Sequence, residues 1–216
     1  SDEGLVDALD SVLAQGRTKE FVVLHTYGSH FNYRERYPRS EAFFRPDDAS
    51  EAKASNRQQL VNAYNNSIRQ TDRLLHDIIA ALRKTGAVAA MLYTSDHGED
   101  IFDDARHLFL HASPFPSFWQ LHVPLVVWTS PAYRERHADI ASCLNANRRK
   151  QAESNSVFHT LLTLGGVATR YRNDALSLAS RAYANHPRLF VDDHNQPRTY
   201  DACLQPIDME KMRTKE

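Results

Sequence analysis

Apolar residues that recur every three or four positions predict three helices in this chain. They lie at residues 5–13, 60–82 and 157–164, and a glycine follows each segment. A spacing near 3.6 residues places apolar side chains on one face of a helix, and glycine is typical of the position where a helix ends. The segment 60–82 has the longest regular pattern, so we expect one of its faces to pack on a sheet.

Continuous apolar runs predict strands. Such runs occupy residues 21–24, 87–94 and 123–128, and a shorter run at 188–191 suits a late edge strand. Strands that are apolar at successive positions are typical of parallel sheets covered on both faces. Because these strands alternate with helices, we expect a layered α/β fold with a mostly parallel sheet flanked by helices.

Two segments lack such patterns. Residues 31 to about 56 are polar and aromatic and contain two prolines, which predicts a long irregular excursion. Residues 206–216 are charged and weakly patterned, so we expect a flexible tail there. A chain of 216 residues with 42% hydrophobic content fits a single domain, 1–216, with a core of its own.

Composition and charge exclude several classes of function. The formal net charge is −1, with 26 Lys and Arg against 27 Asp and Glu, so no overall field attracts nucleic acid. No apolar run approaches the ~20 residues of a membrane helix. The chain begins at Ser1, so we expect a processed protein or part of a longer one. Cys143 and Cys203 lack the spacing of a metal or redox motif, and whether they pair stays open.

Asp96 and His97 are the first candidates for chemistry. They follow the predicted strand at 87–94, and ligands of α/β sheets bind beyond the carboxyl ends of the strands. A carboxylate and an imidazole suit a cation such as zinc. Gly98 permits a tight turn, and Glu99 can fix the loop by accepting hydrogen bonds. The same residues would also fit a polar loop that caps a helix.

His30 and His111 form a second candidate pair. His30 also follows a predicted strand, so it could share an edge of the sheet with Asp96 and His97. Facing one pocket, the two histidines could donate hydrogen bonds to a phosphoryl or sulfuryl group, protonate a leaving group, or hold a second metal. A single loop histidine is more often a solvated surface residue.

Five segments in order resemble the phosphoethanolamine transferases that modify lipid A, members of the alkaline phosphatase/sulfatase superfamily. The segments are FVVLHTYGSH at 21–30, continued by a Tyr-Pro step at 37–38; YTSDHGE at 93–99; Leu-His at 110–111; HVPLVVW at 122–128; and the helix at 155–164. Their order and approximate spacing are those of the family from about residue 21 to 166. Five ordered matches are more specific than any one of them.

The resemblance implies an alkaline phosphatase-like fold, of which this chain is the C-terminal part of the periplasmic catalytic domain. It implies that Asp96 and His97 bind Zn²⁺, and that His30 and His111 contact the substrate phosphate or a second zinc ion. It also implies transfer of phosphoethanolamine from a phospholipid donor to lipid A or another surface glycolipid. The parent protein would lie in the inner membrane, held by segments that precede this chain, with the domain facing the periplasm.

Departures from the family pattern limit that inference. The family's nucleophilic threonine and a further acidic metal ligand precede the equivalent of residue 21, so we expect this chain alone to be inactive. The loop after Glu99 lacks the family's glycines, and Phe31 rather than glycine follows His30. Two other functions remain open: hydrolysis of a sulfate or phosphate ester, and a noncatalytic binding domain.

Overall fold

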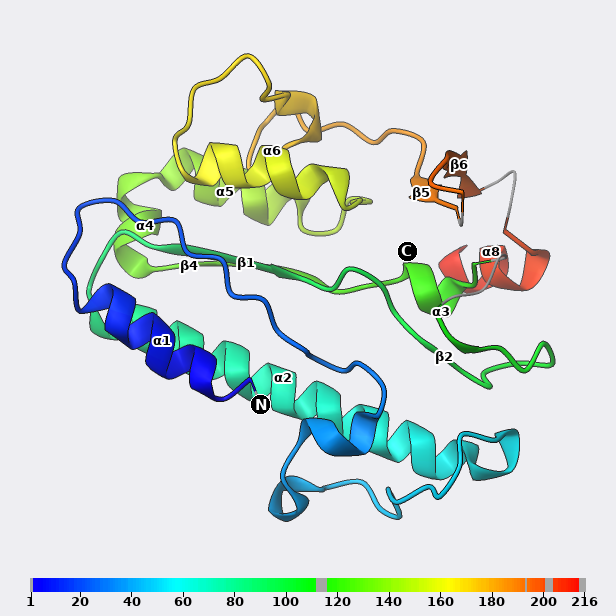
Figure 1. The fold of residues 1–216 in the computed structure, drawn as a ribbon. Helices are drawn as coiled ribbons and strands as arrows, with labels where there is room; N and C mark the ends of the chain where they lie inside the picture. Colours follow the sequence, from blue (N-terminus) through cyan, green and yellow to red (C-terminus); the bar gives the residue numbers. More distant parts are fainter. Residues whose placement is uncertain (1, 112–115, 193, 201–203, 214–216) are drawn as a thin grey trace. The chain divides into compact units, whose positions relative to one another are not determined.

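The computed structural model describes residues 2–111, 116–192, 194–200 and 204–213, and it divides into two compact units (Figure 1). Unit 1 comprises the residues up to Gly86 together with Ile101–Phe109. Unit 2 comprises Ala87–Asp100 and the residues from Leu110 onward. None of the helices in the described ranges combines the length and apolar character needed to cross a membrane.

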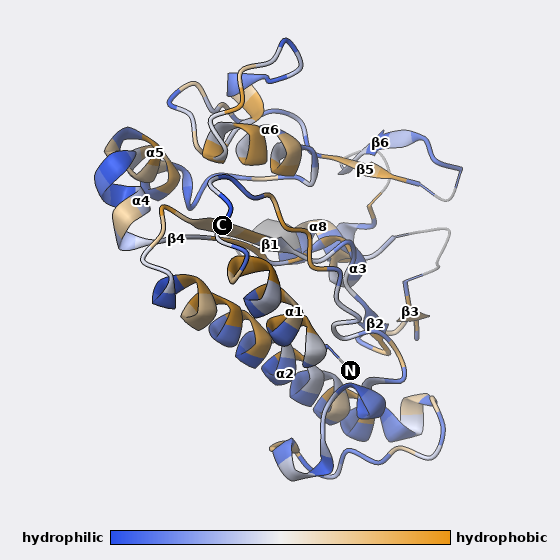
Figure 2. Cartoon of the chain, turned by 60° about the vertical axis from the view of Figure 1, so that its left-hand side comes forward, coloured by the Kyte–Doolittle hydropathy of each residue, from blue (hydrophilic) through white to orange (hydrophobic). Residues whose placement is uncertain are grey.

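Unit 1 is built on two helices, α1 (Gly4–Leu13) and α2 (Arg57–Lys84), which contact each other. Both confirm the predicted periodicity, and hydrophobic and hydrophilic residues alternate in bands along α2 (Figure 2). The buried apolar residues of α2 recur at helical spacing: Leu60, Ala63, Leu74, Ile78 and Ala81. The helix ends before Gly86, whose φ of 64° is readily adopted only by glycine.

The long excursion of unit 1 is ordered by buried amide side chains of α2. It carries short 3-10 helices at Tyr33–Arg36, Arg39–Glu41 and Ala54–Asn56. Asn66 accepts hydrogen bonds from the backbone N–H groups of Phe43 and Phe44, at 3.0 and 2.9 Å. A polar side chain of α2 thus accepts hydrogen bonds from backbone N–H groups of the excursion, which would otherwise need water as a partner.

A buried hydrogen bond links Tyr37 and Asp47 within the same excursion. The Tyr37 hydroxyl donates to Asp47 at 2.5 Å, and Asn66 lies beside both groups. Burial, followed by this bond, raises the pKa of Tyr37 to about 12. The excursion therefore has a polar core as well as contacts to a helix.

Residues 21–24 do not form the predicted buried strand. The side chains of Phe21 and Val23 are 75% and 74% exposed, and the segment has no strand assignment. An apolar run becomes a strand only when another backbone pairs with it, and none of the described residues of unit 1 does so. The prediction of a strand buried on both faces is wrong for these residues.

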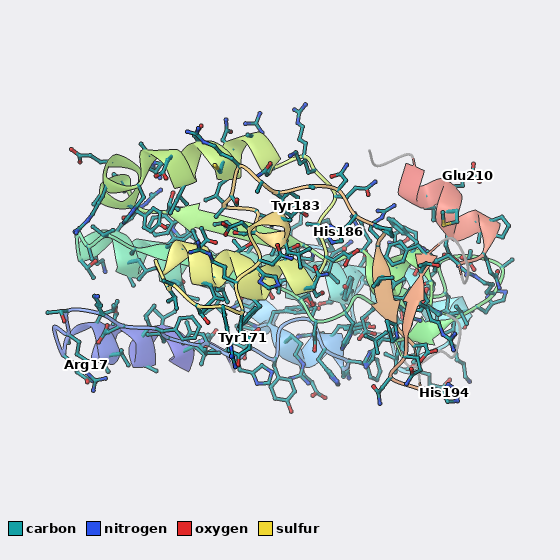
Figure 3. The ribbon with its side chains drawn as sticks, turned by 90° about the horizontal axis from the view of Figure 1, so that it is seen from above. Arg17, Tyr171, Tyr183, His186, His194 and Glu210 are labelled. Atoms are coloured by element: carbon teal, nitrogen blue, oxygen red, sulfur yellow. The ribbon has the colours of Figure 1, made fainter. Side chains whose placement is uncertain are left out.

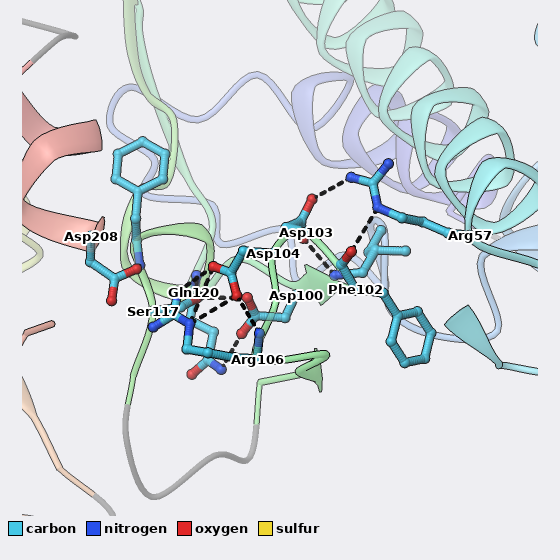
Figure 4. A network of polar contacts seen from close by, with 11 residues as sticks. Arg57, Asp100, Phe102, Asp103, Asp104, Arg106, Ser117, Gln120 and Asp208 are labelled. Atoms are coloured by element: carbon cyan, nitrogen blue, oxygen red, sulfur yellow. Dashed lines mark hydrogen bonds and ion pairs between the residues drawn. The ribbon is translucent and has the colours of Figure 1, made fainter. Parts of the chain in front are cut away.

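The turn at Ile101–Phe109 joins unit 1 through aromatic side chains. Phe109 stacks on Phe102 with ring centroids 5.0 Å apart and meets Phe31 edge-on at 5.4 Å. Arg57 of α2 donates to the carbonyl of Phe102 at 2.9 Å and to the carboxylate of Asp103 at 2.8 Å (Figure 4). One basic side chain thus fixes the backbone of this turn.

Unit 2 is a layered α/β unit around strands β1 (Ala90–Thr94) and β4 (Leu125–Thr129). Its other described elements include α3 (Phe118–Leu121), α4 (Pro131–Arg136), α5 (Ala138–Asn147), α6 (Asn155–Leu164), a 3-10 helix at Asp174–Leu176, β5 (Leu189–Val191), β6 (Pro197–Thr199) and α8 (Pro206–Arg213). Tyr133, Leu164 and Ala179 form one buried apolar cluster beside Val127 of β4, and Phe118 and Leu204 form another. The layered α/β class and the helix at 155–164 are confirmed.

The strand pairs described in unit 2 are antiparallel rather than parallel. Leu92 of β1 lies opposite Val127 of β4, and β5 pairs with β6 in the same sense. A parallel pair needs a crossover connection, usually a long helix. Between β1 and β4 the described residues supply only two-residue strands, β2 (Asp100–Ile101) and β3 (Phe109–Leu110), and the four-residue α3. The expected mostly parallel sheet is therefore not found in the described part of the chain.

The C-terminal part of unit 2 is tied down by polar contacts. Tyr183 and His186 lie close together (Figure 3), with ring centroids 6.5 Å apart. Glu153 accepts a hydrogen bond from the backbone of Leu189 at 3.0 Å, and its other oxygen lies 3.6 Å from His186 Nε2. Within the segment 206–216, expected to be a flexible tail, Pro206–Arg213 form α8, in which Asp208 is fully buried, and the expectation of a tail stays a prediction. Cys143 is buried on α5, whereas Cys203 lies outside the described residues.

Candidate metal centre

The loop after β1 is pressed against α3. The N–H of Gly98 donates to the carbonyl of Gln120 at 2.7 Å. A Cβ atom at position 98 would lie 2.0 Å from the carbonyl oxygen of Trp119, so only glycine fits without moving the backbone. His97 and Glu99 are the neighbours of Gly98 in the chain. This contact therefore fixes the backbone positions from which both side chains extend.

His97, Glu99 and His111 converge on one small region of unit 2. The donor atoms of these three side chains all lie within 4.8 Å of one another. The two imidazole rings stack with centroids 3.6 Å apart at 25°, and His111 Nδ1 lies 3.0 Å from Glu99 Oε1. Two imidazoles and a carboxylate are a donor set found in zinc sites, so the residues present fit a divalent metal.

The hydrogen bonds of the two rings indicate which atoms face a ligand. His97 Nδ1 lies 3.0 Å from the carbonyl of Gly98, and His111 Nδ1 lies beside the Glu99 carboxylate. A neutral imidazole that donates from Nδ1 carries its lone pair on Nε2. Glu99 is almost buried, with 4% of its side chain exposed, and its contact orients the His111 ring as carboxylates do for histidine ligands.

Asp96 lies at the exposed margin of this group. Its side chain is 85% exposed, and one carboxylate oxygen is 3.8 Å from His97 Nε2. The same oxygen accepts a hydrogen bond from the backbone of His97 at 3.0 Å. Asp96 and His97 thus share one loop, as expected, and their role as metal ligands stays a prediction.

His30 belongs to unit 1, where it has its own polar neighbours. Its Nδ1 atom is 2.6 Å from the carbonyl of Phe31, and Arg36 donates to the His30 carbonyl at 3.0 Å. The Arg36 guanidinium also lies over the Tyr27 ring at 4.6 Å. The structure brings His111 together with His97, whereas the expected pairing of His30 with His111 stays a prediction.

Glu99 is a possible metal donor that the sequence analysis did not identify as one. From the sequence we expect it only to hold the loop by hydrogen bonding. In the structure its carboxylate meets His111, twelve positions along the chain, and belongs to the group of possible metal donors. A signal was present in the sequence, because an acidic residue two positions from a candidate histidine ligand can reach the same ion.

A buried polar network backs the loop on the α3 side (Figure 4). The carboxylate of Asp100, 2% exposed, accepts hydrogen bonds from Ser117 at 2.8 Å and from the side chain of Gln120 at 2.6 Å. Ser117 is also the N-cap of α3 and accepts from Gln120 N at 3.3 Å. Asp208 of α8 accepts from the N–H of Phe118 at 2.8 Å. The elements next to these candidate metal ligands are thus held by buried carboxylates.

Phosphoethanolamine transferases are among the characterised proteins similar to this chain. Kdo(2)-lipid A phosphoethanolamine 7''-transferase of Salmonella typhimurium is 35% identical over 154 residues, covering 69% of this chain and 26% of that protein. Phosphoethanolamine transferase EptA of Escherichia coli K12 is 33% identical over 178 residues, covering 79% of this chain and 32% of that protein. The chain therefore spans about a quarter to a third of the length of these relatives.

Solved structures show the same fold. The C-terminal periplasmic domain of EcEptC from Escherichia coli, in complex with Zn, has a TM-score of 0.81 at 20% identity, over 94% of this chain and 57% of that one. The integral membrane protein lipooligosaccharide phosphoethanolamine transferase A from Neisseria meningitidis has a TM-score of 0.75 at 29% identity, over 82% and 34%. The sulfatase family itself matches at residues 1–167. This chain belongs to the sulfatase family.

Proposed function

We propose that this chain is part of a zinc-dependent transferase that moves phosphoethanolamine from a phospholipid to lipid A or another surface glycolipid. The convergence of His97, Glu99 and His111 carries the proposal, because it builds a metal-sized group of donors from two of the segments that resemble the family. The relatives are named for this type of reaction, which supports the choice of substrate.

Each residue of the proposed site has a separate role. His97 and His111, with Asp96 or Glu99, would hold the zinc ion. When bound, zinc supplies a Lewis acid that neutralises charge on a transferring phosphoryl group. Glu99 contacts His111 Nδ1 at 3.0 Å, which orients the His111 ring with Nε2 as its metal-binding nitrogen. His30 is proposed as a further phosphate contact, as the resemblance implies.

The setting of the proposed reaction is the periplasmic face of the inner membrane. The solved relatives are periplasmic or integral membrane transferases, which supports this location. The resemblance places the nucleophilic threonine before residue 21.

The experiment compares lipid A from cells that carry or lack the full-length gene. Mass spectrometry should show a phosphoethanolamine addition that depends on the gene and disappears in the His111→Ala variant. The control variant is His194→Ala, which removes an exposed histidine from the same unit and should leave the addition unchanged. Unchanged lipid A and surface glycolipids in cells that express the intact enzyme would exclude the transfer.

Hydrolysis of a sulfate or phosphate ester is the second candidate, because the matching family is the sulfatase family. Both reactions need a metal and an activated nucleophile, so the site alone does not separate them. Purified full-length protein incubated with p-nitrophenyl sulfate, p-nitrophenyl phosphate and a fluorescent phosphatidylethanolamine separates the two. Ester cleavage without any lipid conversion would favour the hydrolase.

A further inference from the structure

Asp100 directly follows Glu99 in unit 2. Its carboxylate side chain is buried in the protein rather than exposed to solvent. With 2% of its surface exposed, its carboxylate accepts hydrogen bonds from Ser117 Oγ at 2.8 Å and Gln120 Nε2 at 2.6 Å. Removing a carboxylate from water is costly, and hydrogen bonds such as these two offset part of that cost. A buried carboxylate beside a candidate metal ligand calls for an explanation.

Two of the partners of Asp100 also hold the rest of the loop. Gln120 binds Asp100 through its side chain and Gly98 through its backbone carbonyl, at 2.6 and 2.7 Å. Ser117 binds Asp100 and caps α3 at the same time. The backbone on both sides of Glu99 is therefore tied to the same short helix.

We propose that Asp100 is a positioning residue for the metal group, clamping the loop onto α3 so that Glu99 meets His111. The loop has no regular secondary structure between Ser95 and Gly98, so without the clamp its side chains would sample other positions. Residues that orient metal ligands typically contribute a factor of about 10 to 100 in metal affinity. The inference rests on the metal role proposed above for His97, Glu99 and His111.

A matched pair of serine variants tests the clamp. Ser117 and Ser130 are both buried N-cap residues of unit 2, 0% and 3% exposed, and each accepts an N–H of its own helix. Ser117 donates to Asp100, whereas Ser130 donates to the carbonyl of Ala87 at 2.8 Å. Zinc affinity, measured by competition with a chromophoric chelator, should fall about tenfold in Ser117→Ala and remain unchanged in Ser130→Ala. Equal affinities in the two variants would overturn the proposal.

Two substitutions of Asp100 itself separate hydrogen bonding from packing. Asp100→Ala removes both acceptors and should weaken zinc binding by about tenfold or more. Asp100→Asn keeps the shape: Ser117 can still donate to the remaining oxygen, and the Gln120 amide can turn its oxygen toward the new NH2 group. Zinc affinity in Asp100→Asn should therefore lie closer to wild type than in Asp100→Ala. An Asn variant as weak as the Ala variant would contradict a hydrogen-bonded clamp.

A measurement on the zinc-free chain keeps this inference independent of the proposed function. Long-range ¹H–¹⁵N spectra of the imidazoles report whether His111 holds one tautomer with its proton on Nδ1 toward Glu99. Wild type and Ser130→Ala should show that single tautomer, whereas Ser117→Ala and Asp100→Ala should show an average of both. If wild type bound no zinc, the proposed metal role would fail, and these spectra alone would decide the positioning role. Identical spectra in all four proteins would sink it.

Discussion

Residues 21–30 and 90–98 begin alike and end differently. Each is an apolar run that leads through a threonine to a glycine and a candidate histidine. In the second segment, β1 pairs with β4 and its residues are partly buried. In the first, no strand forms and Phe21 is 75% exposed. The comparison teaches that an apolar run predicts a strand only if a second backbone completes it, and that a loop is held firmly where its strand is paired.

Substituting the glycine of each segment should give the largest contrast. Gly98→Ala places a Cβ atom 2.0 Å from the Trp119 carbonyl oxygen, so the loop must move. We expect the free energy of unfolding to fall by about 3 kcal/mol or more, and zinc binding to be lost. Gly28→Ala has room, with Thr26 Oγ1 at 3.7 Å, and costs only its positive φ of 55°, about 1 to 2 kcal/mol. Urea denaturation of both variants measures the difference. Equal losses would mean that the two loops are held alike.

Valine truncation should separate the two runs by a smaller amount. Val127 lies opposite Leu92 and packs on the core formed by Tyr133 and Leu164, so Val127→Ala should cost about 1 kcal/mol. Val23 is 74% exposed, and Val23→Ala should change the unfolding free energy by less than about 0.5 kcal/mol. Thermal or urea unfolding of the two variants gives these values. A comparable loss at Val23 would show that residues 21–24 are covered in solution.

Alkaline pH should test how the long excursion after the first segment, residues 31 to about 56, is held in place. Burial and the Asp47 hydrogen bond raise the pKa of Tyr37 to about 12 from an ordinary value of 10.0. The folded pKa is the higher one, so this contribution to stability is complete below about pH 10 and is lost as the pH rises toward 12. Absorbance titration near 295 nm should lose a tyrosine step near pH 12 in Tyr37→Phe. Tyr27→Phe, which removes an exposed tyrosine, should retain that step.

The sequence predicted those helices and strands whose hydrophobic pattern lies within a single segment of the chain. The helix α2 and the strands β1 and β4 were predicted because their residues carry the period or the continuous apolarity that burial requires. The antiparallel pairing was not, because strand direction depends on connections that a hydrophobic pattern does not encode. Helix α8 was missed since it is held by a buried aspartate, Asp208, rather than by an apolar face.

The candidate site was predictable in its residues more than in its contacts. His97 and His111 were recognised separately, and the structure brings them together. The contact of Glu99 with His111, and the burial of Asp100 beneath the loop, depend on a return of the chain that no residue spacing reveals. Motifs therefore identified chemically capable side chains, and the tertiary structure decided which of them meet.

The short turn between Glu99 and His111 has a consequence for how the site could arise. All three grouped donors fall between residues 97 and 111, so little chain entropy is lost in closing the loop that joins them; doubling its length would cost only about 0.6 kcal/mol. A site encoded so compactly could assemble early on a nascent polypeptide and tolerate wide divergence elsewhere in the domain. Grafting residues 93–122 onto an unrelated scaffold is a realistic route to a small artificial metal binder.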